Sequence, residues 1–314
     1  MNEDCIMMTF YTNNKGLVAS DSFELNGWIN VISPSPEERK YLLDEIKLPE
    51  AFYSDIEDVD ERPRIEIEDD WSLFILRIPV KTNDVKLPFI TVPLGIIFKD
   101  QIFVTICFHS TDILNDFVSY STRKNIRIQN DFEMVLRILL SSSIWYLKYL
   151  KQINQLIKLA ETNLEKSIKN EDLQTLLQIE KCLVFFMTSL KGNDILFHRL
   201  KMIKSQRENY DEDLIEDVDI EIRQAQETTS IYSNILSGMM DAYASVISNN
   251  LNIIMKRLTS ISILIMIPTL VASLYGMNIP NGLEDSKHSF IGIIAVSLVL
   301  SLFGAIMFKR KNLF

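Results

Sequence analysis

The sequence predicts an α+β membrane protein, in which an N-terminal cytoplasmic α/β domain precedes a long helix that becomes the first of two transmembrane helices. Three observations predict it. The 314 residues include 42 acids and 32 bases, yet the mean hydropathy is slightly positive at +0.09. The two properties separate along the chain: residues 1–257 hold 40 acids and 28 bases, whereas residues 258–314 hold two acids and four bases. Finally, no proline occurs between Pro93 and Pro268, which is typical of long uninterrupted helices.

Composition excludes several classes of protein. The proportions of apolar, charged, glycine and proline residues are not those of a disordered or collagen-like chain. The acidic body would repel phosphate, so we expect no nucleic-acid partner. The cysteines, Cys5, Cys107 and Cys182, form no CxxC pair, and the three histidines have no zinc-ligand spacing. The sequence contains no phosphate-binding loop and no nucleophile elbow, and we expect neither an enzyme nor an organic cofactor.

Two uncharged segments predict the membrane spans. No charged residue occurs from Leu258 to Leu283 or from Ser289 to Phe308, and about 20 helical residues cross a bilayer. Bases precede the first segment and follow the second, so we expect a multi-pass protein of the cell membrane with both termini in the cytoplasm. The expected domains are a cytoplasmic α/β domain (1–130), a cytoplasmic helical region (131–210), the cytoplasmic part of a stalk helix (211–257), two transmembrane helices (258–277 and 290–308), an outer loop (278–289) and a basic cytoplasmic tail (309–314).

The first 130 residues alternate strand and helix signals. Ser35 caps a helix that we expect to run to about Lys47, with Pro36 in its first turn. A tight turn at Lys99 and Asp100 indicates a hairpin. Apolar or alternating segments predict strands over residues 28–32, 64–68, 71–80, 89–98 and 102–108.

The rest of the cytoplasmic part predicts three long helices. We expect two of them over about 131–168 and 171–207, and a third that starts near Asp211 and has no strong stop signal before Gly276. The third would be roughly 100 Å long at 1.5 Å per residue, which is far more than a bilayer requires. A helix of that length must project into the cytoplasm and needs partners to bury it.

The third helix carries a polar seam. Steps of alternately four and three residues from Asp241 meet no branched aliphatic or aromatic side chain, although the residues between them beyond 258 are mostly Ile, Leu and Val. Such a face would line an ion path in a ring of helices, or would be a close helix–helix contact, because small residues also let membrane helices approach. The seam consists of Asp241, Ser245, Ser248, Asn252, Met255, Thr259, Ser262, Met266, Thr269, Ser273 and Gly276.

The seam ends at Tyr275-Gly276-Met277-Asn278, and here the chain resembles the CorA-type magnesium transporters, whose hallmark is a Gly-Met-Asn tripeptide at the outer end of the first of two transmembrane helices. The resemblance extends back through the first span and includes residues 60–64. It implies a funnel-shaped homopentamer in which Gly276, Met277 and Asn278 form the selectivity filter. The pore and gate positions that it implies are Asp241, Asn252, Met255, Leu258, Met266 and Thr269.

The resemblance also implies magnesium both as the transported and as the regulatory ion. Eight of the fourteen residues from Glu208 to Glu221 are acidic and none is basic. Such a run is commonly a solvated helix face, but the resemblance places an intersubunit magnesium sensor there. Asp217 is the matching position, and we expect Asp84 of a neighbouring subunit as its partner. Cytoplasmic magnesium would then hold the gate shut.

Alternatives to magnesium influx stay open. Co²⁺ or Ni²⁺ could also pass through the same pore. The chain could also be a carrier of zinc or another divalent cation within the same family, with or without proton coupling, because such a carrier would have the same Gly-Met-Asn ring. In a different class, the chain would be a membrane-anchored coiled-coil scaffold whose seam is only a packing surface.

Overall fold

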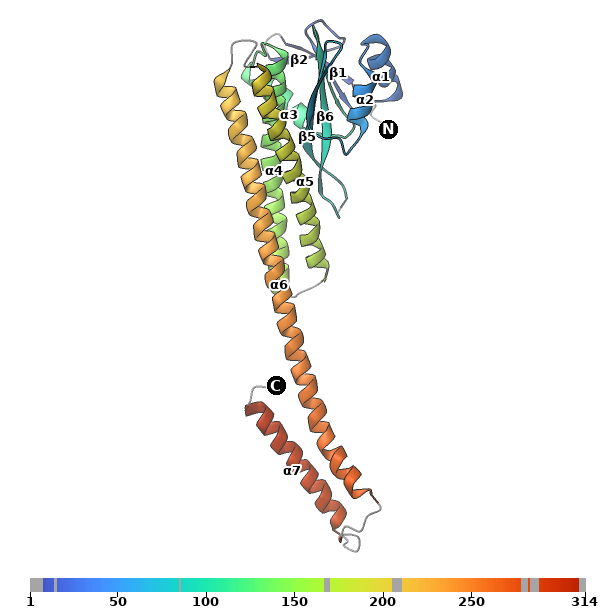
Figure 1. The fold of residues 1–314 in the computed structure, drawn as a ribbon, viewed down its shortest axis with the longest axis vertical. Coiled ribbons are helices and arrows are strands. Elements are labelled where there is room, and N and C mark those ends of the chain that lie inside the picture. The colour runs from blue at the N-terminus through green and yellow to red at the C-terminus, as the bar shows by residue number, and fades with distance from the viewer. Residues whose placement is uncertain are drawn as a thin grey trace. The chain divides into compact units, whose positions relative to one another are not determined.

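The computed structural model describes residues 8–13, 16–84, 86–166, 170–204, 211–277, 282 and 288–310. The chain divides into two compact units, Met1–Gly238 and Met239–Phe314. One helix, α6 (Glu212–Tyr275), begins in the first unit and ends in the second (Figure 1). The predicted long helix that enters a candidate membrane span is therefore confirmed.

A mixed β-sheet forms the centre of the first unit. Within the described residues it has seven strands in the order β2-β1-β3-β7-β6-β5-β4. Neighbouring strands are antiparallel except β3 and β7, which are parallel. The strands are β1 (Met8–Asn13), β2 (Leu17–Ser20), β3 (Trp28–Ile32), β4 (Arg64–Glu68), β5 (Trp71–Lys81), β6 (Phe89–Lys99) and β7 (Ile102–Cys107).

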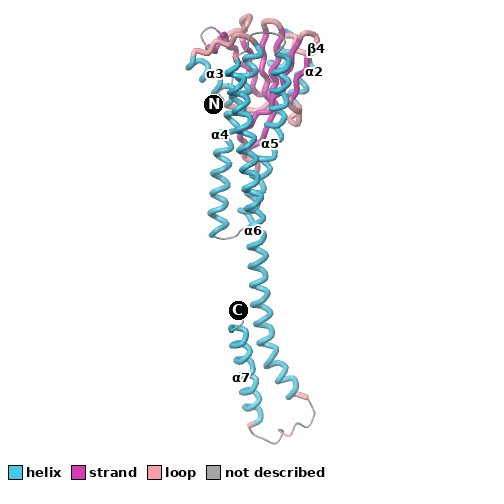
Figure 2. Tube along the Cα trace, turned by 60° about the vertical axis from the view of Figure 1, so that its left-hand side comes forward, coloured by secondary structure: helices cyan, strands magenta, loops and turns pink. Residues whose placement is uncertain are grey.

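Helices cover both faces of the sheet, as Figure 2 shows. One hydrophobic core joins the sheet to α3 (Ile113–Lys124), α4 (Asp131–Lys166), α5 (Asn170–Lys204) and the start of α6. A second core joins the opposite face to a π-helical turn (Tyr41–Glu45), which follows the exposed helix α1 (Pro36–Lys40), and to α2 (Glu50–Glu57). The strands between them are buried on both faces, which explains their nearly continuous apolar sequences.

Local sequence signals account for several element ends. The Ser35 hydroxyl accepts a hydrogen bond from the Glu38 amide (3.2 Å), and the Glu38 carboxylate accepts one from the Ser35 amide (2.8 Å), which forms a capping box. The β4–β5 hairpin turns through Asp69 and Asp70, both with positive φ (48° and 67°). Two such residues are typical of the type I′ turn that matches strand twist.

The expected strands at 28–32, 64–68, 71–80, 89–98 and 102–108 are all present, within one residue at each end. The helix expected from Ser35 to about Lys47 is present as a continuous helical run, in which α1 (Pro36–Lys40) is followed directly by a π-helical turn (Tyr41–Glu45), and it ends where Lys47 has a φ of 61°. The helix cannot continue past this point, because Pro49 disfavours helical backbone at Leu48. The chain turns back instead, and the Leu48 amide donates to the Leu42 carbonyl at 3.0 Å.

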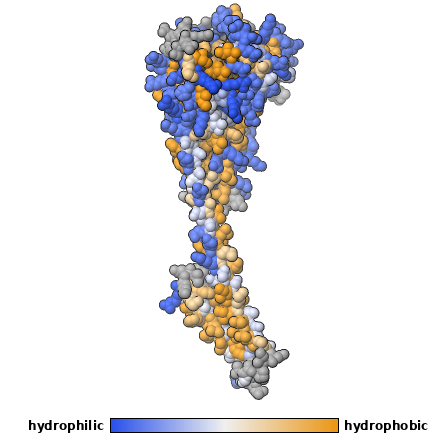
Figure 3. All heavy atoms as spheres, in the orientation of Figure 1, coloured by the Kyte–Doolittle hydropathy of each residue, from blue (hydrophilic) through white to orange (hydrophobic). Residues whose placement is uncertain are grey.

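The second unit consists of the last part of α6 and α7 (Ser289–Arg310). Both helices are long and apolar enough to cross a membrane, and almost none of their apolar stretch is buried within the chain. Figure 3 shows hydrophobic side chains covering this unit, whereas the visible face of the first unit is mostly hydrophilic. A side chain at Gly304 of α7 would meet Leu264 of α6 at 3.1 Å and Ile267 at 3.4 Å, so the two helices pack closely there.

Candidate functional site

The predicted polar seam of α6 is exposed along its whole length. All eleven residues of the seam, of which Asp241 is the first and Gly276 the last, are solvent-exposed in the single chain. The exposed fractions of Met255 and Met266 are 57% and 65%. The seam is therefore a face that nothing in the described part of this chain covers.

The opposite face of α6 is the one that α7 covers. In the span, Ser260 is buried, and Leu264, Ile267 and Val271 are partly buried. At 100° per residue, these positions point roughly 130–190° away from the centre of the seam within the span. The helix pair thus presents its small and polar face away from α7, as a pore-lining helix with an outer companion would.

Leu258 and Thr259 lie on either side of the seam, each roughly 50° from its centre on an ideal helix. Leu258 is 56% exposed. The departure of Leu258 from the strict four–three spacing is therefore no larger than that of Thr259, and either side chain can reach a common axis with a small helix rotation.

Two seam hydroxyls bond to their own helix. Ser262 donates to the Leu258 carbonyl at 2.9 Å, and Thr269 donates to the Ile265 carbonyl at 3.0 Å. Pro268 lies inside α6 and lacks an amide proton. Because these hydroxyls use their protons within the helix, their oxygen lone pairs face outward as acceptors.

The outer end of the seam is only partly described. Gly276 continues the helical pattern, since its amide donates to the Ala272 carbonyl at 2.9 Å, and Met277 is 50% exposed. Asn278, the third residue of the expected filter, lies outside the described residues. The filter therefore remains a prediction.

The two expected regulatory carboxylates occupy exposed positions of the first unit. Asp217 lies on α6, and Asp84 lies in the turn between β5 and β6, where its carboxylate accepts a hydrogen bond from the Lys86 amide at 2.8 Å. In the parts of the chain that the structure describes, no three His, Cys, Asp or Glu side chains gather where they could hold a metal. A shared site between subunits is left as a prediction.

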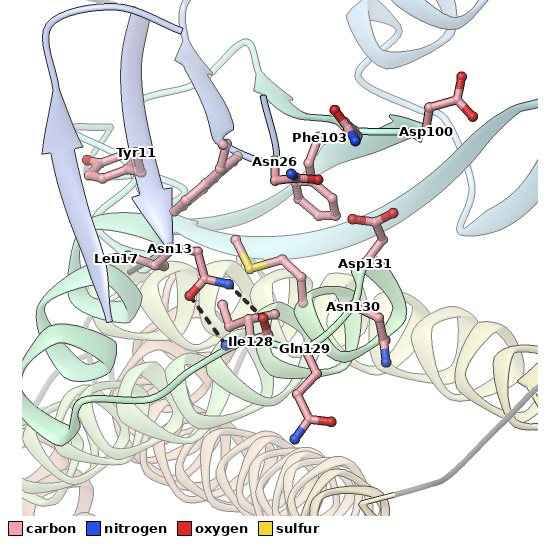
Figure 4. Close-up of a pocket in the computed structure, with 14 residues that line it drawn as sticks. Tyr11, Asn13, Leu17, Asn26, Asp100, Phe103, Ile128, Gln129, Asn130 and Asp131 are labelled. Atoms are coloured by element: carbon pink, nitrogen blue, oxygen red, sulfur yellow. Dashed lines mark hydrogen bonds between the residues drawn. The ribbon is translucent and has the colours of Figure 1, made fainter. Parts of the chain in front are cut away.

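Sequence reasoning missed a polar cavity of about 130 Å³ where β1, β3 and the β6–β7 turn meet the start of α4 (Figure 4). Asn13 and Ile128 both line the cavity, and the Asn13 side-chain amide donates to the Ile128 carbonyl at 2.6 Å. Asp131 lines it, and burial raises the pKa of this carboxyl to about 6. The residues that form the cavity come from segments far apart in the sequence, so no local sequence pattern predicts it.

Asp131 gives a pH-dependent prediction. Its folded-state pKa is above the ordinary 3.8, so the stability it contributes is present at low pH and is lost as the pH rises through about 6. We expect Asp131→Asn to raise the free energy of unfolding by about 1–2 kcal/mol at pH 7.5, a figure reduced for partial solvent exposure. The gain should shrink towards pH 4–5. Thermal unfolding of both proteins across this pH range measures it, and a gain that does not depend on pH would contradict the assignment.

Known proteins resemble the chain over nearly its full length. The family model described as "CorA-like Mg2+ transporter protein" matches residues 26–310. The chain belongs to this family. The cobalt/magnesium transport protein CorA of Methanocaldococcus jannaschii is 26% identical over 297 residues, which span 91% of this chain and 90% of that protein. The corresponding protein of Thermotoga maritima is 34% identical over 90 residues, 28% of this chain and 26% of that protein.

Solved structures support the same fold. The complete structure of the CorA magnesium transporter from M. jannaschii superposes with a TM-score of 0.81 and 23% identity, and it covers 98% of this chain and 99% of that one. The expected fold class is thereby confirmed: a soluble α/β domain, a long helix and two candidate membrane helices. The family name also agrees with the resemblance that the Gly-Met-Asn motif indicated.

Proposed function

We propose that this chain is the subunit of a homopentameric channel that admits Mg²⁺ across the cell membrane. The observation that carries the proposal is the exposed polar seam of α6, which lies opposite the α7-covered face and leads to Gly-Met-Asn. Membership of the CorA-like family and the names of its relatives support magnesium as the ion. In such an assembly both termini would be cytoplasmic.

The selectivity filter in this proposal is a ring of Asn278 side chains, with Gly276 and Met277 supporting it. Magnesium dehydrates reluctantly and usually keeps several waters. Neutral amide oxygens can accept hydrogen bonds from those waters, whereas a ring of carboxylates would trap a divalent cation. Thr269 would offer the next ring of hydrogen-bond acceptors further into the pore. Its hydroxyl donates its proton to the Ile265 carbonyl, so the hydroxyl oxygen is left to accept from the water shell of the ion.

The gate in this proposal is formed by Met255 and Leu258, with Met266 as a further apolar collar. Their side chains are exposed in the single chain, and rings of them would constrict the path with apolar surface. Narrow apolar rings stop ions by excluding water. Asn252 and Asp241 would line the path below the gate, and a carboxylate there would concentrate cations.

Regulation would come from Asp217 of one subunit and Asp84 of the next, bridged by cytoplasmic Mg²⁺. Asp217 and the gate residues belong to one uninterrupted helix, α6. A cation that bridges neighbouring subunits at Asp217 can therefore restrain the helix that carries the gate. Without the cation, the acidic residues of the α6 start would repel one another and free the helices.

The regulatory assignment predicts that Asp217→Ala removes the protection that Mg²⁺ gives against trypsin. The native chain should be cleaved at least several times more slowly with Mg²⁺ than with a chelator, because the bridged subunits move less. Glu216→Ala is the matched control, since Glu216 is also an exposed carboxylate of α6. Unchanged magnesium protection in Asp217→Ala, measured by digestion time courses, would refute the site.

Magnesium uptake into liposomes containing the full chain tests the proposed function. An inside-negative potential should drive uptake, because each charge gains about 2.3 kcal/mol per 100 mV. Parallel assays with Co²⁺, Ni²⁺ and Zn²⁺ at several pH values decide the ion preference; the names of the relatives favour cobalt as a second substrate. No flux of any of these ions would instead favour a membrane-anchored scaffold.

A further inference from the structure

A groove between α3 and α4 is lined by more basic than acidic side chains. It encloses about 290 Å³, near the lower limit for small-molecule sites. Its lining includes three bases, Arg123, Arg137 and Lys148, and one acid, Asp116. Two of these bases have acidic partners: Lys148 pairs with Asp116, and Arg137 pairs with Glu133 and lies 3.9 Å from Asp211.

The order of groups along the groove follows from the helix hairpin. Asp116, near the start of α3, accepts hydrogen bonds from Trp145 (3.0 Å) and Lys148 (2.6 Å) of α4. The end of α3 is joined to the start of α4 by residues 125–130 alone. The two helices are therefore antiparallel, with Arg123 and Arg137 at one end of the groove and the Asp116–Lys148 pair at the other.

The middle of the groove is apolar. Phe117 is buried, whereas Tyr120 and Ile144 are 46% and 39% exposed. Leu140 and Ile126 complete this surface, and Ser141 lies beside it. An apolar surface flanked by bases suits a molecule that has both a hydrocarbon or aromatic body and a negative charge.

Arg123 is the base with the most freedom to bind a ligand. Its guanidinium lies 5.9 Å from the centre of the Tyr120 ring, and it makes no ion pair with a carboxylate in the described part of the chain. Arg137, by contrast, is paired with Glu133 at 2.7 Å. A charge-assisted hydrogen bond from Arg123 to a carboxylate or phosphate would be a new interaction and would displace no partner.

We propose that the α3–α4 groove binds a small organic anion, with the charged group at Arg123 and the apolar body over Phe117, Leu140 and Ile144. Two sources share this chemistry: a nucleoside phosphate and an acyl carboxylate. The proposal does not rest on ion transport, because the groove lies wholly within the first unit and contains no residue of the seam.

Equilibrium dialysis of the full chain in lipid nanodiscs, with empty nanodiscs as the blank, tests the proposal. The probes are AMP, octanoate and inorganic phosphate. AMP or octanoate should bind saturably at one site per chain, and at least tenfold more tightly than phosphate. Binding of AMP alone identifies a nucleoside phosphate, binding of octanoate alone identifies an acyl carboxylate, and binding of both supports their shared chemistry.

Two variants and one control locate the site. Arg123→Gln should weaken binding at least tenfold by removing the charge, and Ser141→Leu should do so by filling the groove. Arg199→Gln removes another exposed arginine, which lies on α5, and should leave binding unchanged. Thermal unfolding checks that all three variants remain folded. The proposal is overturned if neither organic anion saturates, if phosphate binds as tightly as the better one, or if Arg199→Gln weakens binding as much as Arg123→Gln.

Discussion

Asn278→Ala is expected to reduce magnesium flux through reconstituted protein by about 100-fold. Each subunit would lose one amide oxygen from the ring that receives the hydrated ion. Net hydrogen bonds of this kind are worth about 0.5–1.5 kcal/mol each, and in the proposed pentamer five of them would act together. A combined loss of ~3 kcal/mol corresponds to about two orders of magnitude.

The expected loss depends on position rather than on the residue type. Asn281 belongs to the same outer segment but follows the Gly-Met-Asn tripeptide by three residues. Asn281→Ala should therefore keep most of the flux. Both variants need equal protein content and equal pentamer content in the liposomes, which electrophoresis after cross-linking can verify.

The same pair of variants separates a pore from a packing seam. If α6 used its seam only to contact other helices, Asn278 would lie beyond that contact and alanine would be tolerated. Equal flux in the native chain and Asn278→Ala would then remove the filter assignment, even if the native chain transports magnesium. A reduction in both variants would indicate a fragile outer loop instead of a specific ring.

The extent to which the fold could be predicted differs between long and short segments. The long apolar strands β5 and β6 and the long helices carry enough periodic signal to be recognised alone. The short elements β1, β2, α2 and α3 do not. The strand Leu17–Ser20, for example, has four residues and exists because β1 pairs with it, and that pairing is a tertiary interaction that propensity cannot report.

The candidate sites divide in a similar way. The seam could be predicted because an α-helix has a fixed number of residues per turn. Residues at regular spacings of three and four therefore lie on the same face, even when they are far apart in the sequence. The groove between α3 and α4 could not, since residues of α3 such as Asp116 and residues of α4 such as Lys148 come together only when the two helices pack. The partner of Asp217 is harder still, because the expected carboxylate comes from another subunit.

Arg77→Met is expected to lower the free energy of unfolding by about 2–4 kcal/mol, the largest stability effect that we predict for this chain, because each buried acceptor left without its donor costs about 1–3 kcal/mol. Arg77 lies on β5 and donates to the carbonyl oxygens of Val59 (2.7 Å), Glu61 (2.9 Å) and Thr91 (2.5 Å). Burial lowers the pKa of its guanidinium, but the nearby Tyr146 and acidic residues oppose that effect. Methionine keeps the stem and leaves three carbonyl oxygens without their donor.

The backbone of Arg77 is part of the same network. Its amide donates to the Asn193 side chain at 2.9 Å, and its carbonyl accepts from Asn193 (2.7 Å) and Tyr146 (2.9 Å). Tyr146 on α4 is fully buried and Asn193 on α5 is 1% exposed. The backbone of Arg77 thus contacts both helices, and these bonds survive Arg77→Met, whereas its guanidinium connects β5 to the segment before β4 and to β6. The expected loss therefore comes from the side-chain bonds alone.

Arg64→Met provides the contrast. Arg64 lies on β4 and pairs with the carboxylates of Asp55 (2.6 Å), Glu61 and Glu66 (3.1 Å), but its side chain is 30% exposed. Water can solvate those carboxylates after the substitution, so we expect a cost of about 1 kcal/mol. Thermal unfolding of the full chain should therefore show a shift several times larger for Arg77→Met. Equal shifts would mean that the carbonyls of Val59, Glu61 and Thr91 find water when the Arg77 side chain is absent, and that the guanidinium is not what holds these segments together.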